Sequence, residues 1–277
     1  MAATQQPVLA APFDSVAARY DETFTLSKIG QAQRAAVWRE LAKTFRSGQR
    51  ILEIGCGTGV DACFLAKRGV RVLACDPSSR MIDVATRRIQ QSGLQGLVQP
   101  RVLAAENLPS LWSSERFDGA FSDFGALNCV EDLRKLAIDL AVLLKPGATA
   151  LLCWMGPFCT WEIVWYLAHR NRRKAFRRLQ SGGVTAKIAE DASVHVQYPS
   201  FKSIRRSFAP EFKVRSVQGV GVAVPPSYCE SWACRHPHLV ELFSKFDSRL
   251  GRCPGIRSLG DHVLVSLHRE RTATPAD

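Results

Sequence analysis

The sequence predicts an α/β fold built on a doubly wound, mostly parallel sheet. Apolar strand-like runs alternate with helical patterns between residues 31 and 154, an order typical of parallel sheets with helices on both faces. The strands are continuous apolar runs, as expected for strands buried on both faces. Two further strand patterns, at 212–220 and 262–268, bring the expected total to seven strands.

Each core element follows from its pattern. Pro77 stops the second strand, and Ser78 or Ser79 caps the helix that follows. That helix carries Met81, Ala85 and other apolar residues at helical spacing. The expected order is helix 31–46, strand 50–55, helix 60–68, strand 71–76, helix 79–91, strand 98–104, helix 107–113, strand 117–122, helix 130–143 and strand 148–154.

A glycine-rich turn, Gly55-Cys56-Gly57-Thr58-Gly59, follows the first strand. Glycine permits positive φ and lets a ligand touch the backbone. The order of strand, tight loop and helix cradles a nucleotide-like ligand at the carboxyl end of a parallel strand. Asp76 ends the second strand 17 residues after Gly59, where a carboxylate can accept hydrogen bonds from both hydroxyls of a ribose.

The spacing of these glycines distinguishes two ligands. Nicotinamide enzymes use GxGxxG, whose third glycine lets the helix pack under a pyrophosphate. Here the spacing is GxGxG, and Val60 takes the place of that glycine. Glu53 lies two positions before Gly55, where a carboxylate suits the ammonium group of S-adenosylmethionine (SAM). A nicotinamide oxidoreductase is therefore a poor alternative.

The pattern resembles motif I of the class I SAM-dependent methyltransferases, and Asp76 matches their ribose-binding acidic residue. Four more segments resemble this family over residues 10–155. The first contains the pairs Phe13-Asp14 and Tyr20-Asp21, which resemble the entry segment of ubiquinone/menaquinone-type methyltransferases. The other three are the DAExLP-like segment 103–109, the fourth strand with its polar end at 117–123, and the LKPGG-like turn at 143–147.

The resemblance implies a Rossmann-like seven-stranded sheet with an antiparallel last strand, SAM as cofactor, S-adenosylhomocysteine (SAH) as product, and no metal. Asp123, Asn128 and His262 are candidates for catalysis or for contact with the methyl acceptor. Each has a structural alternative, in helix capping or in packing. The implied cofactor residues are Tyr20, Glu53, Gly55, Cys56, Gly57, Gly59, Asp76, Pro77, Met81, Ala105, Glu106 and Asp123.

Two segments exceed what the core needs, and each is expected to leave the sheet at its ligand edge. Together with the N-terminal segment they would form a lid that excludes water. The aromatic run 161–167 either lines an apolar pocket or packs the lid onto the core. The expected division is an N-terminal lid segment (1–30), the SAM-binding core (31–155), a helical basic lid insertion (156–208), return strands (209–220 and 261–270), a second lid insertion (221–260) and a tail (271–277).

The net charge of +12 is unevenly distributed. No acidic residue lies between Ile163 and Ala189, whereas that stretch holds a run of cations at 170–178. Three interpretations stay open: a solvated helix face, a surface that attracts an anionic substrate, carrier arm or lipid surface, and a nucleic-acid site. Nucleic acid is the least favoured, because no RNA-binding module or aromatic interleaving accompanies the run.

The nine cysteines show no CxxC or Cys/His metal spacing, which predicts reduced thiols in a cytoplasmic protein. No run is long enough for a membrane span, and residues 1–12 lack a signal-peptide pattern. We expect a methyltransferase acting on an O, N or C atom of a small or mid-sized metabolite, with anionic and carrier-linked acceptors included. The alternatives are an RNA methyltransferase that uses the basic run and a non-catalytic SAM-binding protein. Nothing in the sequence indicates an oligomeric state.

Overall fold

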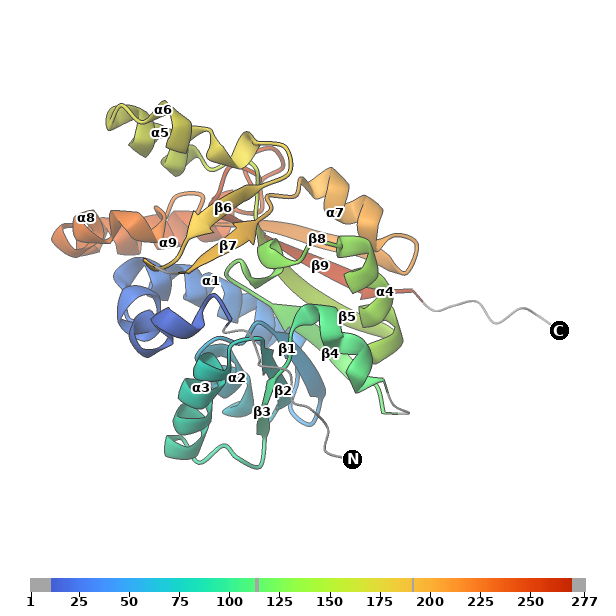
Figure 1. Ribbon diagram of the computed structural model, residues 1–277. Helices are drawn as coiled ribbons and strands as arrows, with labels where there is room; N and C mark the ends of the chain where they lie inside the picture. Colours follow the sequence, from blue (N-terminus) through green and yellow to red (C-terminus); the bar gives the residue numbers. More distant parts are fainter. Residues whose placement is uncertain (1–10, 113–114, 191, 271–277) are drawn as a thin grey trace.

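A seven-stranded sheet with the order β3-β2-β1-β4-β5-β9-β8 forms the centre of the protein (Figure 1). The computed structural model describes residues 11–112, 115–190 and 192–270, so residues 1–10 of the N-terminal segment and the tail 271–277 lie outside the described residues. The first five strands are parallel, and β9 runs antiparallel to β5 and β8. The predicted sheet with an antiparallel last strand is confirmed. The strands are β1 (Arg50–Ile54), β2 (Arg71–Asp76), β3 (Val98–Val102), β4 (Phe117–Ser122), β5 (Leu144–Met155), β8 (Phe212–Val220) and β9 (His262–Arg269).

Helices cover both faces of the sheet. Because side chains alternate along a strand, Ile51 of β1 packs in the layer of α1, α2 and α3, and Leu52 packs in the layer of α4 and α7. No described helix is long and apolar enough to cross a membrane. The helices of the two layers are α1 (Lys28–Thr44), α2 (Val60–Ala66), α3 (Ser79–Gln91), α4 (Leu133–Leu143) and α7 (Phe201–Phe208).

Two predicted helices of the core differ in the structure. The helix expected at 107–113 is the 3-10 helix η3 (Ala105–Leu111), which contains Pro109. A proline has no N–H for an α-helical hydrogen bond. The helix expected at 130–143 is replaced by the 3-10 helix η4 (Ala126–Cys129) and by α4. The carboxylate of Asp132 accepts hydrogen bonds from two N–H groups of the first turn of α4, which sets the start of that helix.

The first insertion consists of a helix pair, a hairpin and α7. The helices α5 (Thr160–Ala168) and α6 (Arg172–Ala175) pack against each other and project at the top of Figure 1. The short 3-10 helix η5 (Arg177–Leu179) then leads into the antiparallel hairpin of β6 (Val184–Lys187) and β7 (Ser193–Val196). The hairpin lies beside η4, close to the carboxyl end of β4.

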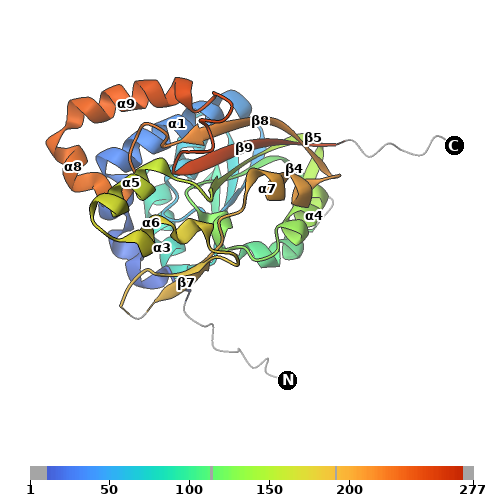
Figure 2. The ribbon, with the colours of Figure 1, turned by 90° about the horizontal axis from the view of Figure 1, so that it is seen from above.

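The second insertion packs along α1 rather than over the ligand edge of the sheet. It contains η6 (Ser227–Cys229), α8 (Glu230–Arg235) and α9 (Pro237–Leu250), and Figure 2 shows α9 beside α1. Apolar residues of the insertion bury Ile29 of α1. The Glu230 carboxylate accepts hydrogen bonds from the N–H groups of Lys28 and Ile29, at 2.7 and 3.1 Å. The second insertion therefore packs on an apolar face of α1.

A buried ion cluster fastens the first insertion to β9. Glu162 of α5 accepts hydrogen bonds from Arg177 and Arg178, at 2.7 and 2.8 Å for the shortest contacts. Arg178 also donates to the carboxylate of Asp261 at 2.7 Å. Gln33 of α1 reaches the same carboxylate at 3.3 Å. Two cations of the basic run therefore point inward and are neutralised.

Removing the carboxylate at the centre of this cluster should destabilise the protein. Glu162→Gln leaves the buried guanidinium of Arg178 with one anionic partner, and breaking a buried ion pair typically costs about 3 kcal/mol. Urea unfolding of the purified variant measures this loss. Glu241→Gln is the matched control, because the Glu241–Lys245 pair is exposed on both sides. Equal stability of the two variants would contradict the assigned role of Glu162.

Candidate active site

A cavity of about 320 Å³ lies at the carboxyl ends of β1, β2 and β4. Its wall combines the glycine loop, the ends of these strands, the segment 103–106 after β3 and part of the N-terminal segment. Doubly wound sheets bind their ligands at this edge. The predicted cofactor residues on the wall are Tyr20, Gly55, Cys56, Gly57, Asp76, Pro77, Met81, Ala105, Glu106 and Asp123.

The glycine loop turns sharply because its three glycines have positive φ, 73° at Gly55, 51° at Gly57 and 75° at Gly59. A Cβ atom on Gly55 would lie 2.2 Å from the Cβ of Ala126, so this glycine is required for packing. A Cβ atom on Gly57 would meet no atom within 4 Å. Gly57 lines the cavity, so a ligand can touch the backbone there. Gly59, which is not on the wall, caps α2.

Asp76 anchors the glycine loop from the end of β2. Its two carboxylate oxygens accept hydrogen bonds from the N–H groups of Gly57 and Ser78, each at 2.9 Å. Burial raises the pKa of Asp76, and these two backbone donors oppose the rise. A carboxylate has about four acceptor positions. Asp76 can therefore hold the loop and still accept hydrogen bonds from ribose hydroxyls.

Next to the loop, three buried carboxylates surround one buried guanidinium, that of Arg34. Arg34 donates to Asp61, which also accepts the indole N–H of Trp38 at 2.6 Å. Both carboxylate oxygens of Glu53 and the Oδ2 atom of Asp123 lack a hydrogen-bond partner among the described residues. Asp123 lies on the cavity wall, whereas Glu53 lies behind it. The cluster has more negative than positive groups.

Burial perturbs the acids of this cluster. Burial raises the pKa of Glu53 and of Asp123 well above the usual range, Asp61 adds to the rise, and Arg34 opposes it. Burial also raises the pKa of Tyr20 to about 12, so this phenol stays neutral near pH 7. A cationic ligand would favour the ionised forms of Glu53 and Asp123, whereas the negative charge of a pyrophosphate would oppose their ionisation.

The N-terminal segment contributes Pro12, Phe13 and Tyr20 to the cavity wall, and these residues flank η1 (Asp14–Arg19) and precede η2 (Asp21–Thr25). The carboxylate of Asp14 accepts a hydrogen bond from Ser78 at the start of α3, at 2.5 Å. The carboxylate of Asp21 accepts one from Thr58 in the glycine loop, at 2.7 Å, and pairs with Arg88 of α3. The two aspartates of the entry segment therefore tie it to the loop and to α3.

Two of the predicted catalytic residues are engaged elsewhere. The side chain of Asn128 bonds the backbone of Met155 through both its atoms, at 2.8 and 2.9 Å, and also donates to the Gln197 carbonyl. His262 is buried behind Phe124, with ring centroids 5.7 Å apart, and burial lowers its pKa. Neither residue is on the cavity wall. The start of β9 does reach the ligand edge, but Phe124 lies between His262 and the cavity.

One end of the cavity is apolar, and sequence reasoning did not find it. Its residues come from η4, the end of β5 and the hairpin of the first insertion, so they are remote in sequence. Val194 and Val196 alternate along β7, but such a short strand carries no signal for a ligand. These wall residues are Cys129, Val130, Met155, Val194 and Val196.

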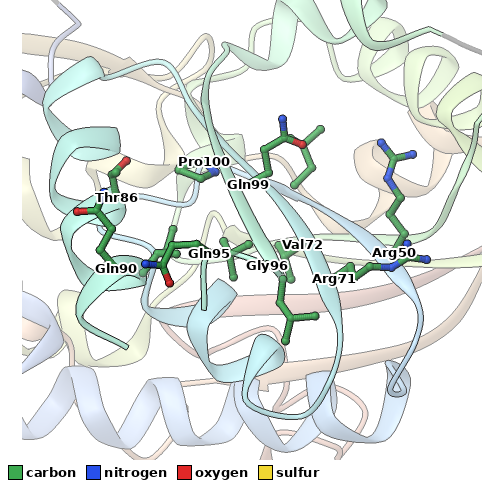
Figure 3. A pocket seen from close by; sticks show the side chains of 13 residues that line it. Arg50, Arg71, Val72, Thr86, Gln90, Gln95, Gly96, Gln99 and Pro100 are labelled. Atoms are coloured by element: carbon green, nitrogen blue, oxygen red, sulfur yellow. The ribbon is translucent and has the colours of Figure 1, made fainter. Parts of the chain in front are cut away.

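A second cavity, of about 450 Å³, lies at the opposite edge of the sheet, beside the amino ends of β1 and β2. Figure 3 shows Thr86 and Gln90 of α3 on one side of it and Arg50 on the other. Its described lining has no carboxylate, thiol or imidazole group. It offers no acid, base or thiol nucleophile, so the candidate active site is the cavity at the glycine loop.

Comparison with known proteins agrees with this site. Residues 51–147, which include the glycine loop, match a protein family described as a methyltransferase domain. This segment of the chain is therefore similar to a methyltransferase domain. The chain is 35% identical to a demethylmenaquinone methyltransferase of Clavibacter sepedonicus over 147 residues, which cover 52% of this chain and 57% of that protein. The chain thus spans less than two thirds of that relative.

Solved structures share the methyltransferase fold. The CcbJ methyltransferase from Streptomyces caelestis superposes with a TM-score of 0.63 at 16% identity, over 95% of this chain and 99% of that chain. An S-adenosylmethionine dependent methyltransferase from Mesorhizobium loti gives 0.57 at 20% identity, over 84% and 98%. At these identities the comparison shows the fold alone.

The residues around the cavity fit SAM. Asp76 suits the ribose, and the open space at Gly57 admits close contact with the backbone. The unpartnered Oδ2 atom of Asp123 on the cavity wall suits a cationic group of SAM, and the buried carboxyl group of Glu53 lies behind that wall. When bound, SAM supplies an electrophilic methyl group.

Two glycine substitutions should separate binding from folding. Gly57→Ala should lower SAH affinity by about tenfold or more, because the added methyl group enters the cavity, and should cost about 1–2 kcal/mol of stability for its left-handed φ. Gly55→Ala should lower stability further, because its Cβ clashes with Ala126. Calorimetric titration with SAH and thermal unfolding measure the two effects. Unchanged SAH affinity in folded Gly57→Ala would contradict the assigned contact.

SAH affinity should rise with pH. The raised pKa values of Glu53 and Asp123 favour their protonated forms in the free protein, and the ligand's ammonium group favours the ionised forms. Binding therefore releases protons, and the affinity increases by at most about tenfold per pH unit for each proton. Calorimetry between about pH 6 and pH 8, in buffers with different ionisation enthalpies, counts the protons. In Glu53→Gln the SAH affinity should increase less steeply with pH. An unchanged pH dependence would show that Glu53 releases no proton on binding.

Proposed function

We propose that this protein transfers the methyl group of SAM to a neutral, largely apolar small molecule. The supporting observation is the apolar end of the cavity, where three elements contribute Cys129, Val130, Met155, Val194 and Val196. Burying an apolar ligand surface against such a wall contributes about 25 cal/mol per Å².

The charges of the cavity argue against an anionic acceptor. Arg34 is the one cation among the described residues of the wall, and it is already paired with Asp61. Phosphate or carboxylate groups of a metabolite or of a carrier arm would meet Asp123 and Glu106 instead. The demethylmenaquinone methyltransferases among the relatives take, by name, a quinone-type acceptor, which belongs to the neutral class proposed here.

Within this proposal, Asp123 acts as the general base. It lies on the wall at the end of β4, and its Oδ2 atom is unpartnered among the described residues. Burial raises the pKa of Asp123 and so makes its carboxylate a stronger base. A stronger base removes a proton more readily from a weakly acidic acceptor. An in-line displacement depends mainly on the positions of the acceptor, the methyl carbon and the sulfur. The glycine loop positions SAM, and the apolar end of the cavity positions the acceptor.

The function is tested by incubating the protein with methyl-labelled SAM and a cell extract, then separating the products. Label is expected in neutral compounds that partition into organic solvent, together with formation of SAH. Label confined to anionic metabolites or to RNA would overturn the proposed acceptor class. Failure of folded protein to bind SAH in calorimetry would overturn methyl transfer itself.

Two carboxylate substitutions should affect catalysis and cofactor binding to different extents. Asp123→Asn should lower kcat by about 10²–10⁴ and remove the acidic limb of the pH–rate profile, because the base is lost. Asp76→Ala should instead weaken SAH binding by about 1–3 kcal/mol, because the ribose hydroxyls lose their acceptor. Steady-state kinetics and calorimetry on both variants make the comparison. A normal pH profile in Asp123→Asn would rule out the assigned base.

A further inference from the structure

The first insertion carries an exposed surface in which large apolar side chains alternate with cations. Val164 and Leu167 of α5 are 58% and 42% exposed, and Phe176 and Leu179 beyond α6 are 43% and 46% exposed. The cations of this surface are Arg170, Arg172, Arg173 and Lys174, and all four are exposed. We call these eight residues the apolar–basic surface.

The packing of the insertion is complete without these side chains. Trp161 packs with Trp232 and Phe243 of the second insertion, and Trp165 and Tyr166 lie near Tyr228. α5 and α6 pack against each other, as Figure 1 shows. The four apolar side chains nevertheless keep a large part of their surface in water, which is a poor environment for so many of them in so short a segment.

The positive charges of the surface are not neutralised by a described acidic residue, and Lys174 also lies over the ring of Tyr166, 5.6 Å from its centroid. Unlike Arg177 and Arg178, which pair with Glu162, the four exposed cations form no ion pair with any described residue. The sequence between Ile163 and Ala189 supplies no acidic residue that could neutralise them. The surface therefore combines uncompensated positive charge with exposed hydrocarbon.

We propose that the apolar–basic surface docks on a lipid bilayer that contains anionic headgroups. Cations are attracted to such a surface by about 1 kcal/mol each, while apolar side chains enter the boundary between headgroups and acyl chains. A polyanion in water, such as RNA, would use the cations and leave Val164, Leu167 and Phe176 exposed. The bilayer is the partner that uses both halves of the surface.

The apolar–basic surface is also close along the chain to the apolar end of the cavity. The chain runs from Leu179 directly into the β6–β7 hairpin, and Val194 and Val196 of this hairpin line the apolar end of the cavity. The inference goes beyond the proposed methyl transfer and does not depend on it.

Co-sedimentation of the full chain with vesicles tests the proposal. The protein should bind vesicles of equal parts phosphatidylcholine and phosphatidylglycerol, and should bind pure phosphatidylcholine much more weakly. The triple variant Arg172→Gln, Arg173→Gln, Lys174→Gln should lower the partition coefficient about fivefold per cation, or roughly a hundredfold in all.

Helix α7 offers a control with the same loss of charge. Lys202, Arg205 and Arg206 are exposed, whereas the apolar residues Ile204 and Phe208 of this helix are buried. The triple variant Lys202→Gln, Arg205→Gln, Arg206→Gln should therefore bind the vesicles nearly as well as the unchanged protein. An equal loss in both triple variants would show a general effect of net charge and would overturn the proposal.

A variant of unchanged charge tests the apolar half of the surface. Leu167→Gln, Phe176→Gln should lower vesicle binding about tenfold, because less hydrocarbon is buried at the interface. No loss in this variant, or tight salt-sensitive binding to RNA with no binding to vesicles, would overturn the proposal. Calorimetry with SAH separates the two proposals. If the protein binds SAH normally but does not bind vesicles, only the docking surface is refuted. If the folded protein does not bind SAH, methyl transfer is refuted.

Discussion

The burial of three carboxylates around one guanidinium is the constraint on which the rest of this structure depends. Glu53 comes from β1, Asp61 from α2, Asp123 from the end of β4 and Arg34 from α1, so the cluster joins four elements at the ligand edge. The ring of Phe124 lies 4.8 Å from the guanidinium and closes it off from the side of β4. A buried charge without its partner is strongly destabilising. These elements are consequently held together where the cofactor enters.

Acidic and basic residues are concentrated in different parts of the protein. The chain carries a net charge of +12, yet among the described residues of the cavity wall four acids, Asp61, Asp76, Glu106 and Asp123, outnumber the cation Arg34. Cations gather instead on the outside of the first insertion. A cleft lined by one sign of charge concentrates ligands of the opposite sign. The cavity is thus suited to a sulfonium cofactor, and the outer surface is suited to an anionic partner.

Prediction from the sequence identified residues of the cavity wall where these residues lie close to one another along the chain. The glycine loop, Asp76 and Met81 lie within 27 residues, and all three belong to the cavity wall. It failed where a contact joins distant segments. His262 was placed beside the cavity because β9 starts at that edge, but Phe124 intervenes. Asn128 was placed in the site, but it bonds the end of β5.

The sequence by itself determined the order of the elements, the parallel sheet and the cofactor loop, because periodicity, glycine spacing and strand-end acids are local signals. Tertiary structure decided which face each insertion covers and which residues meet the acceptor. The second insertion lies on α1 because Ile29 offers it an apolar face, and Val194 and Val196 reach the cavity because the hairpin lies beside η4. Such contacts depend on the complementarity of surfaces remote in sequence, and no local pattern records them.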